Sequence, residues 1–418
     1  MHLDDPDVLV IGGGAIGLCS AYYATKAGRR VVLVERGEIG SGCSRGNAGW
    51  LVPSHCIPLA APGVVKKALR WMWSSRSPFS IRPRLDWNLI RWLVSFASAC
   101  DERKARASIP LLRDLTFASL SEFQELASSV GMSFGLQRKG SLMLYLTGKG
   151  LSEGEGDADM LNDHGIASQP WSRDEILHKE PAITSRIAGG IFYPDDHQIV
   201  PSDFTESLAR TCGRLGASVL PGTTVTGFEV SNGTISSVRT TQGDFCPGTV
   251  ILAAGVESPG LAAQLGLRLP IEAGKGYSFS VPTSTLCLSR ALLLSEAKVA
   301  VTPFEEKVRF AGTLELSGID YRINLRKLEA IRESSSSYFS AKLPEVMNEA
   351  WSGLRPCTPD GLPIISNVPQ VDNLVIASGH GMLGVSLAPI TGKLAAQLAC
   401  RASTDFDLSL LSLSRMNH

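Results

Sequence analysis

The sequence predicts an α/β fold that contains a parallel sheet, and two observations support this prediction. Short, uninterrupted apolar runs, such as Val-Leu-Val-Ile at residues 8–11, are typical of strands that are buried on both faces. Glycine is frequent, at 41 of 418 residues, which is above the usual share of roughly 7% and indicates tight turns and close approach of backbone to a ligand. The content of 44% hydrophobic and 19% charged residues suits a large packed core and excludes a disordered chain.

The first element pattern is a strand, a glycine-rich turn, a helix and a second strand. The run at 8–11 leads into Gly12-Gly13-Gly14-Ala15-Ile16-Gly17, which fits G-x-G-x-x-G. We expect a helix over 18–27 and a strand over 31–34 that ends in Glu35. The glycines, the helix start and the acidic residue have the spacing of a dinucleotide-binding unit.

Each part of this pattern has a physical role. Gly12 allows the tight turn, Gly14 lets the backbone approach a pyrophosphate, and Gly17 lets the helix pack closely on the strand. The N-terminus of the helix supplies free N–H groups and partial positive charge. Glu35 can accept hydrogen bonds from ribose hydroxyls, which favours a 2′-hydroxyl over a 2′-phosphate.

Further glycine-rich segments distinguish FAD from NAD. A small, polar stretch at 40–49 follows Glu35, a buried strand ends in small residues at 250–255, and a third strand at 374–379 leads through 380–384 into a helix over 385–400. Glycine-rich segments that follow strands at both ends of one chain suit a long, bent cofactor, so we favour FAD. The residues expected to bind it are Gly12, Gly14, Ala15, Ile16, Gly17, Glu35, Arg36, Ser44, Asn47, Ala48, Gly49, Val225, Ala254, Gly255, Gly381, Met382, Leu383 and Gly384.

Several motifs carry a resemblance to a known family. They are Ser44-Arg45-Gly46-Asn47-Ala48-Gly49, Pro58 to Gly63, Lys275-Gly276-Tyr277-Ser278, Gly353-Leu354-Arg355-Pro356-Cys357-Thr358-Pro359-Asp360-Gly361 and Gly379 to Gly384. With them the chain resembles the D-amino-acid oxidase-like superfamily of FAD-dependent amine oxidoreductases, and most closely the bacterial D-amino-acid dehydrogenases, over most of its length. The resemblance implies an FAD-binding Rossmann-type domain interleaved with an antiparallel-sheet substrate domain.

The expected domains are discontinuous. Residues 1–50, 201–268 and 351–418 are assigned to the FAD-binding domain, and residues 51–200 and 269–350 to the substrate domain. Within the former we expect a helix over 201–216, a strand over 218–220 and a meander that includes 223–230 and 235–241, because apolar and polar residues alternate there.

Three residues are the candidates for contact with an amino-acid substrate. Arg355 is expected to bind its carboxylate, because a planar guanidinium can hold a carboxylate through two hydrogen bonds; the alternative is a structural ion pair. Tyr277 is either a second carboxylate donor or a core tyrosine. His55 either shapes the pocket or accepts a proton from the substrate ammonium, or it is structural. We expect His380 to support the turn at the flavin, and no covalent link through Cys357.

The charge balance and the cysteine pattern limit the classes of partner and the cellular location that we expect. The 40 basic and 40 acidic residues balance, which argues against a general nucleic-acid binder. Residues 66–113, however, hold eleven basic and three acidic residues together with four tryptophans, so we expect either peripheral membrane contact through residues 64–113 or a solvated helix pair. Nine scattered cysteines and an acidic start indicate a cytoplasmic protein, with no metal site.

The leading hypothesis is oxidative deamination of D-amino acids, with hydride transfer from the α-carbon to flavin N5 and a quinone of the respiratory chain or oxygen as electron acceptor. The first alternative is oxidation of hydroxy-D-proline, sarcosine or glycine, which related enzymes perform. The second is a flavin-binding redox partner without an amino-acid substrate, against which Arg355 argues because such a protein needs no carboxylate-binding cation.

Overall fold

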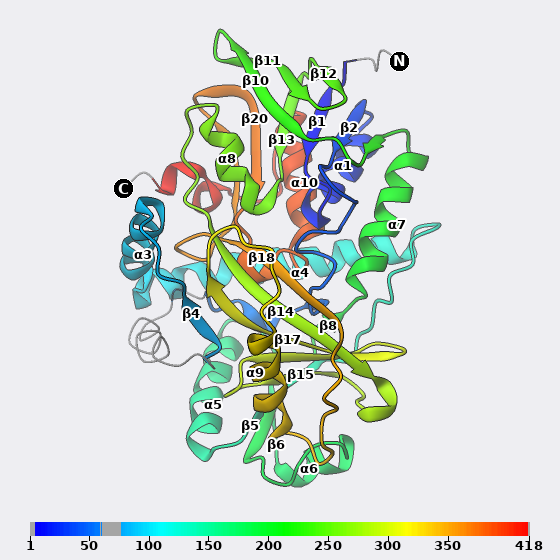
Figure 1. Cartoon of the computed structure of the whole chain (residues 1–418), viewed down its shortest axis with the longest axis vertical. Coiled ribbons are helices and arrows are strands. Elements are labelled where there is room, and N and C mark those ends of the chain that lie inside the picture. Colours follow the sequence, from blue (N-terminus) through cyan, green and yellow to red (C-terminus); the bar gives the residue numbers. More distant parts are fainter. Residues whose placement is uncertain (1–4, 59, 61–76, 417–418) are drawn as a thin grey trace.

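The computed structural model describes residues 5–58, 60 and 77–416, and it contains two large sheets that lie one above the other along the long axis (Figure 1). The upper sheet has six strands in the order β19-β20-β13-β1-β2-β9, and all neighbours are parallel except β19 and β20. Its strands are β1 (Val8–Ile11), β2 (Val31–Val34), β9 (Ser218–Leu220), β13 (Thr249–Leu252), β19 (Ile364–Val368) and β20 (Val371–Ser378). The predicted α/β class and parallel sheet are therefore confirmed.

Helices cover this sheet where the sequence predicted them. α1 (Ala15–Lys26) follows the glycine motif and packs on α10 (Ala388–Ala399) and α7 (Pro201–Arg214). The close approach of α1 and α10 depends on Gly392, because a side chain there would collide with Cys19. The expected meander is the antiparallel sheet β10 (Val225–Ser231), β11 (Thr234–Thr240) and β12 (Gly243–Phe245). A short helix, α8 (Ser258–Ala263), follows β13.

The lower sheet has nine strands and is largely antiparallel. Its order is β18-β14-β17-β16-β15-β5-β7-β6, with β4 paired to β17. Its strands are β4 (Phe79–Ile81), β5 (Ser141–Tyr145), β6 (Gln169–Trp171), β7 (Gly189–Tyr193), β14 (Glu272–Pro282), β15 (Ala291–Leu294), β16 (Val299–Pro303), β17 (Lys307–Leu316) and β18 (Asn348–Cys357). The assumed domain boundary at residue 351 thus falls inside β18, which pairs with β14 throughout.

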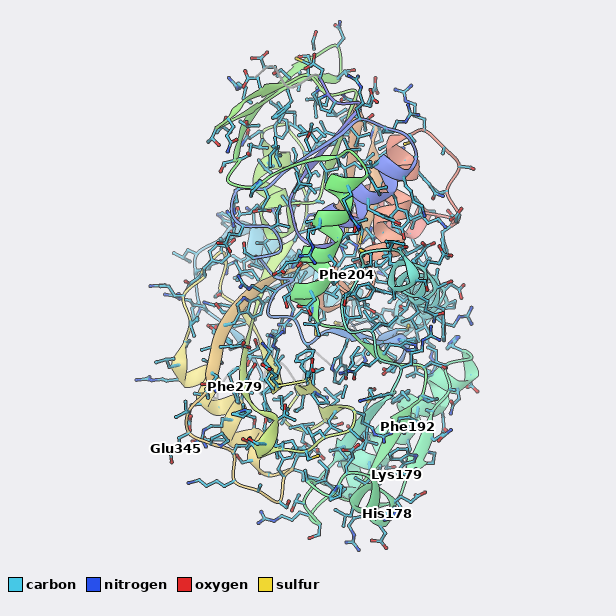
Figure 2. All side chains as sticks on the ribbon, turned by 90° about the vertical axis from the view of Figure 1, so that its right-hand side faces the viewer. His178, Lys179, Phe192, Phe204, Phe279 and Glu345 are labelled. Atoms are coloured by element: carbon cyan, nitrogen blue, oxygen red, sulfur yellow. The ribbon has the colours of Figure 1, made fainter. Side chains whose placement is uncertain are left out.

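The remaining elements surround the lower sheet and join it to the upper one. They are β3 (Trp50–Leu51), paired with β8 (His197–Gln198), and the helices α3 (Trp87–Ala99), α4 (Glu102–Ser128), α5 (Gly148–Asp163), α6 (Arg173–Lys179) and α9 (Leu325–Ser336). α4 packs on α10, and α9 lies on β14 and β17. Figure 2 shows Phe204 on α7 and Phe279 on β14, which belong to separate hydrophobic cores beside the upper and lower sheets.

The two faces of the lower sheet make different contacts. On one face Phe279 stacks on Phe310, with ring centroids 5.1 Å apart, and both pack in the core that includes Leu328 of α9. On the other face, side chains of β14, β16 and β17 donate hydrogen bonds to four consecutive carbonyl oxygens of the glycine-rich segment 45–48. These bonds run from Arg309 to Arg45 (3.3 Å) and Asn47 (2.9 Å), from Ser278 to Gly46 (3.2 Å) and from Thr302 to Ala48 (2.8 Å). The sheet therefore fixes the path of a segment that was predicted to bind the cofactor.

Residues 64–113 are the segment for which membrane contact is expected, and residues 64–76 of it lie outside the described residues. Within the described part, Trp87–Ala99 form the helix α3, with Asp86 as its N-cap. In the described ranges, no helix has both the length and the apolar character needed to cross a membrane.

Candidate cofactor and substrate site

A cavity of about 680 Å³ opens at the carboxyl ends of β1, β2 and β13. This is the edge at which parallel α/β sheets bind their ligands. Most of the predicted cofactor residues line it, namely Gly12, Gly14, Ala15, Ile16, Glu35, Arg36, Ser44, Asn47, Val225, Ala254, Gly255, Gly381 and Gly384. Segments from both ends and the middle of the chain thus form one cavity, as expected for an extended cofactor.

The glycine motif shapes the cavity floor. Gly12 has a φ of +114°, and a side chain there would lie 2.5 Å from the carbonyl oxygen of Ala253. The helix α1 begins at Ala15, and its first turn, Ala-Ile-Gly-Leu, holds no carboxylate, so the positive end of the helix dipole is available to an anion. The Ser44 hydroxyl already accepts a hydrogen bond from the backbone N–H of Ala15, at 3.1 Å, which fixes segment 40–49 against the helix start.

Glu35 stands where β2 ends, and backbone groups hold its carboxylate in place. Its two oxygens accept hydrogen bonds from the backbone N–H groups of Gly13 (2.7 Å) and Gly37 (2.9 Å). An ionised carboxylate has about four acceptor positions, so Glu35 retains capacity for the hydroxyls of a ribose. This arrangement fits the adenosine part of a dinucleotide.

The other predicted cofactor residues lie outside the cavity lining. Gly17 faces the Gly12 carbonyl oxygen, and a side chain there would collide with it, so its role is helix packing. The carbonyl oxygen of Ala48 accepts a hydrogen bond from Thr302 of the lower sheet. Gly49 lies in close contact with the backbone of Ile199. Met382 is half-exposed, and Leu383 packs against the cluster of Trp50 and Val52.

His380 provides a direct test of whether the cavity fits a polar cofactor. It lines the cavity, is 3% exposed, and its Nε2 lies 2.9 Å from the Thr391 hydroxyl. Its Nδ1 is buried and has no hydrogen-bond partner among the described residues. Burial lowers the pKa of His380 to about 3, so the ring is neutral. Because an unsatisfied buried polar atom is unfavourable by about 1–3 kcal/mol, a bound group with hydrogen-bonding atoms, such as FAD, suits this position.

Arg355 lies on β18 beside the cavity wall formed by Gly353, Leu354 and Pro356. Its Nη1 donates a hydrogen bond of 2.8 Å to the carbonyl oxygen of Thr313, and no carboxylate pairs with it in the part of the chain that the structure describes. Burial raises the pKa of the nearby Cys43 thiol, and the charge of Arg355 acts in the opposite direction. Arg355 thus presents a guanidinium that is not neutralised by a described residue, next to a residue of the cavity.

Tyr277 does not join Arg355. The Arg355 guanidinium lies over Gly276, where a side chain would collide with it, and neighbouring residues of a strand point to opposite faces. Tyr277 therefore faces the core on the other side of β14, where its hydroxyl donates a hydrogen bond of 2.7 Å to Glu315. Of the two readings of Tyr277, this geometry favours the core tyrosine with a satisfied hydroxyl.

His55 also lies outside the cavity lining. Its Nδ1 lies 3.0 Å from the Ser54 hydroxyl, and its ring packs edge-on against Trp50 with centroids 5.6 Å apart. Burial and, to a smaller extent, the charge of Lys298 lower the pKa of His55 to about 4. A neutral, packed imidazole is better suited to a structural role than to proton uptake at neutral pH.

The structure adds residues that the motifs did not single out. Cys43, Glu257, Tyr321 and Ser378 line the cavity, and Glu257 and Tyr321 bond to Arg36. A polar residue shortly after the carboxyl end of β13 was a usable signal for Glu257. Tyr321 had none, because it arrives from the loop after β17.

Comparisons with known proteins agree with this geometry. Residues 7–398 match the family described as DAO, FAD dependent oxidoreductase. The chain is 33% identical to the D-amino acid dehydrogenase of Granulibacter bethesdensis over 98% of this chain and 99% of that protein, and 34% identical to that of Methylobacterium nodulans over 94% of each. Its fold is similar to glycine oxidase from Geobacillus kaustophilus (TM-score 0.80, 24% identity, 99% of each chain) and L-proline dehydrogenase from P. horikoshii (TM-score 0.76, 19% identity, 99% and 98%). The chain therefore belongs to the DAO family of FAD-dependent oxidoreductases.

Proposed function

We propose that the protein is a D-amino-acid dehydrogenase, which oxidises a D-amino acid to an imine that water then hydrolyses to a 2-oxo acid and ammonia. The observation that carries this proposal is Arg355, a guanidinium beside the cofactor cavity without a described carboxylate partner. Relatives of nearly the same length that carry the name D-amino acid dehydrogenase support the choice of substrate class.

In this proposal Arg355 binds the substrate carboxylate. One edge of its guanidinium is held by the Thr313 carbonyl, which leaves other N–H groups for a bidentate contact. When bound, FAD would supply the hydride acceptor for oxidation at the α-carbon. The protein then needs to orient the α-hydrogen rather than to provide a strong base, in agreement with the neutral state of His55 and His380.

We also propose that the two electrons pass to a quinone of the respiratory chain, with the protein bound peripherally to the cytoplasmic face of the membrane. Leu85, Trp87, Ile90 and Val94 are exposed, with Trp87 at 75% and Val94 at 65%. The last three are spaced to share one side of α3, while Leu89 and Trp92 are buried. Arg91, Arg103 and Lys104 are exposed and complement an anionic lipid surface, although Asp101 and Glu102 lie beside the last two.

The division into two domains is retained with one change. We assign β18 to the substrate domain, because it is an edge strand of the nine-stranded sheet, and begin the last FAD-binding segment after Cys357. Limited proteolysis of the holoenzyme tests this assignment through the fragments that resist cleavage together.

A panel of substrates under anaerobic conditions tests the proposed reaction. Bleaching of the flavin absorbance by D-amino acids, but not by their L-enantiomers, is the expected result. Faster bleaching by hydroxy-D-proline, sarcosine or glycine would show that these amines, rather than the other D-amino acids, are the substrate class. If no amine bleached a fully loaded flavin, the dehydrogenase proposal would be wrong and a redox partner without its own substrate would be favoured.

A further inference from the structure

The loop between β17 and α9, residues 317–324, reaches from the lower sheet to the cofactor cavity, and we name it the strap. Its Tyr321 hydroxyl accepts a hydrogen bond of 2.6 Å from Nη2 of Arg36 and donates one of 2.8 Å to Oε1 of Glu257. Arg36 also contacts Glu257 through Nη1, at 2.9 Å. Arg36 follows β2 and Glu257 follows β13, so the three side chains join the two sheets. All three line the cavity.

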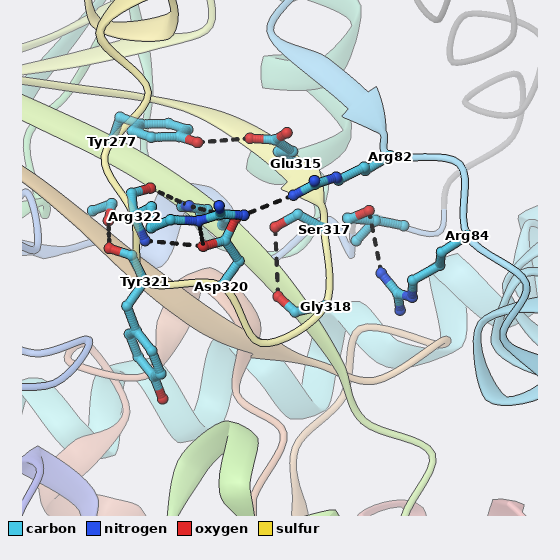
Figure 3. Close-up of polar contacts among 12 residues, drawn as sticks. Arg82, Arg84, Tyr277, Glu315, Ser317, Gly318, Asp320, Tyr321 and Arg322 are labelled. Atoms are coloured by element: carbon cyan, nitrogen blue, oxygen red, sulfur yellow. Dashed lines mark hydrogen bonds and ion pairs between the residues drawn. The ribbon is translucent and has the colours of Figure 1, made fainter.

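The strap is anchored to the lower sheet by a network of charges around Asp320 (Figure 3). The Asp320 carboxylate pairs with Arg322 at 2.9 Å, with Arg82 at 3.3 Å and with Lys275 at 3.7 Å. The Lys275 ammonium also donates a hydrogen bond to the carbonyl oxygen of Arg322. Lys275 is only 2% exposed, so water cannot readily replace these partners if they are lost. Breaking the anchor is therefore costly in free energy.

A second contact fixes the backbone of the strap at Tyr321. The Ser352 hydroxyl, on β18, donates a hydrogen bond of 3.1 Å to the carbonyl oxygen of Tyr321. Ser352 itself lines the cavity. Tyr321 is therefore held at its backbone by the lower sheet and at its hydroxyl by the upper one. The guanidinium of Arg36 also lies over its ring, 5.5 Å from the centroid.

We propose that the strap is a wall of the FAD cavity and that Tyr321 is a residue that retains the cofactor, through its bonds to Arg36 and Glu257. Arg36 directly follows Glu35, the expected ribose acceptor, so the wall lies at the adenosine end of the cavity. Removal of the Tyr321 hydroxyl leaves this end closed only by packing. A dinucleotide behind it then leaves more readily.

The rate of FAD release from the holoenzyme tests this proposal without any amino-acid substrate. Free flavin is diluted away, and release is followed by the recovery of flavin fluorescence. Tyr321→Phe removes two hydrogen bonds and is expected to accelerate release about tenfold. Asp320→Asn weakens the anchor of the strap and is expected to accelerate release in the same direction. Tyr321→Phe combined with Glu257→Gln should accelerate FAD release by clearly less than the product of the two single effects, because the two groups act through one contact.

Tyr23→Phe is the matched control. The Tyr23 hydroxyl also donates to a glutamate, Glu122, at 2.6 Å, but neither residue lines the cavity. This variant should release FAD at the wild-type rate even if its melting temperature falls as much as that of Tyr321→Phe. If Tyr321→Phe also released FAD at the wild-type rate, or if both variants were accelerated equally, the proposed role of the strap would be refuted. If the Tyr321→Phe protein is purified without FAD, it is reconstituted with FAD, and its dissociation constant for FAD is compared with that of the wild type instead.

Discussion

The guanidinium of Arg355 crosses β14 at Gly276 and donates a hydrogen bond of 2.8 Å to the carbonyl oxygen of Thr313. Thr313 has a φ of +71°, which is rare for a β-branched residue and marks local strain. It lies where the pairing of β14 with β17 shifts register, between Lys275 and Tyr277. Such a bulge changes the direction of the backbone groups beside it. In this protein it provides the carbonyl that holds Arg355.

Replacement of Arg355 by lysine tests its proposed contact with the substrate carboxylate. A lysine keeps the charge but loses the planar pair of donors and the simultaneous contact with Thr313. We expect KM for D-amino acids to rise about 100-fold or more, because a charge-assisted bidentate contact is worth several kcal/mol. Steady-state kinetics give KM, and the visible flavin spectrum reports FAD content, which should not change. A KM within twofold of wild type would exclude the assignment.

Gly276→Ala tests whether the position of Arg355 matters as well as its presence. A methyl group at 276 would collide with the guanidinium, which must then move from the Thr313 carbonyl. We expect KM to rise about tenfold, since a single misplaced hydrogen bond is worth on the order of 1.4 kcal/mol. Gly156→Ala is the control, because its added methyl meets open space on α5. Equal KM values for the two variants would contradict the positioning role.

How much of the site was predictable depends on how far apart its parts are in the sequence. Gly12 and Glu35 belong to one pattern of about 30 residues, so spacing alone predicted that they lie together at the cavity. The face of Tyr277 depends on the register of β14 with β18, which a single strand does not encode. Tyr321 meets Arg36 from 285 residues away, through a loop without regular structure. That Nδ1 of His380 meets no partner among the residues that the structure describes is likewise a property of packing, not of the motif around it.

Asp196 should make the stability of the protein depend on pH. Its carboxyl is buried and accepts hydrogen bonds from the hydroxyls of Ser54 (2.6 Å) and Ser141 (2.5 Å). Burial raises its pKa from 3.8 to about 7, although these hydrogen bonds oppose the shift. Between these values the folded state binds a proton that the unfolded state has lost. Stability therefore falls as pH rises from about 4 to 7, by a few kcal/mol at most.

Asp196→Asn isolates this contribution from that of other groups. The amide keeps the shape and can still bond to both serine hydroxyls, which rotate to suit. Urea unfolding at pH 4, 5, 6 and 7 should show that the wild-type free energy of unfolding falls relative to the variant as pH rises. Curves that stay parallel over this range would show that Asp196 does not carry the raised pKa.

Flotation with liposomes tests the proposed membrane contact of α3. Trp87 and Val94 expose apolar surface beside basic residues, so insertion into the headgroup region removes that surface from water. Trp87→Ser together with Val94→Ser is expected to lower binding to anionic vesicles about tenfold, since such a change removes at least 1.4 kcal/mol of apolar burial. Val230→Ser is the control, because Val230 is half-exposed on β10 of the three-stranded sheet. Wild-type binding should also weaken as salt rises, because exposed arginines attract the anionic surface. If the double variant bound as well as wild type, or if neither bound at low salt, α3 would have no role at a membrane, and its apolar side would need another partner.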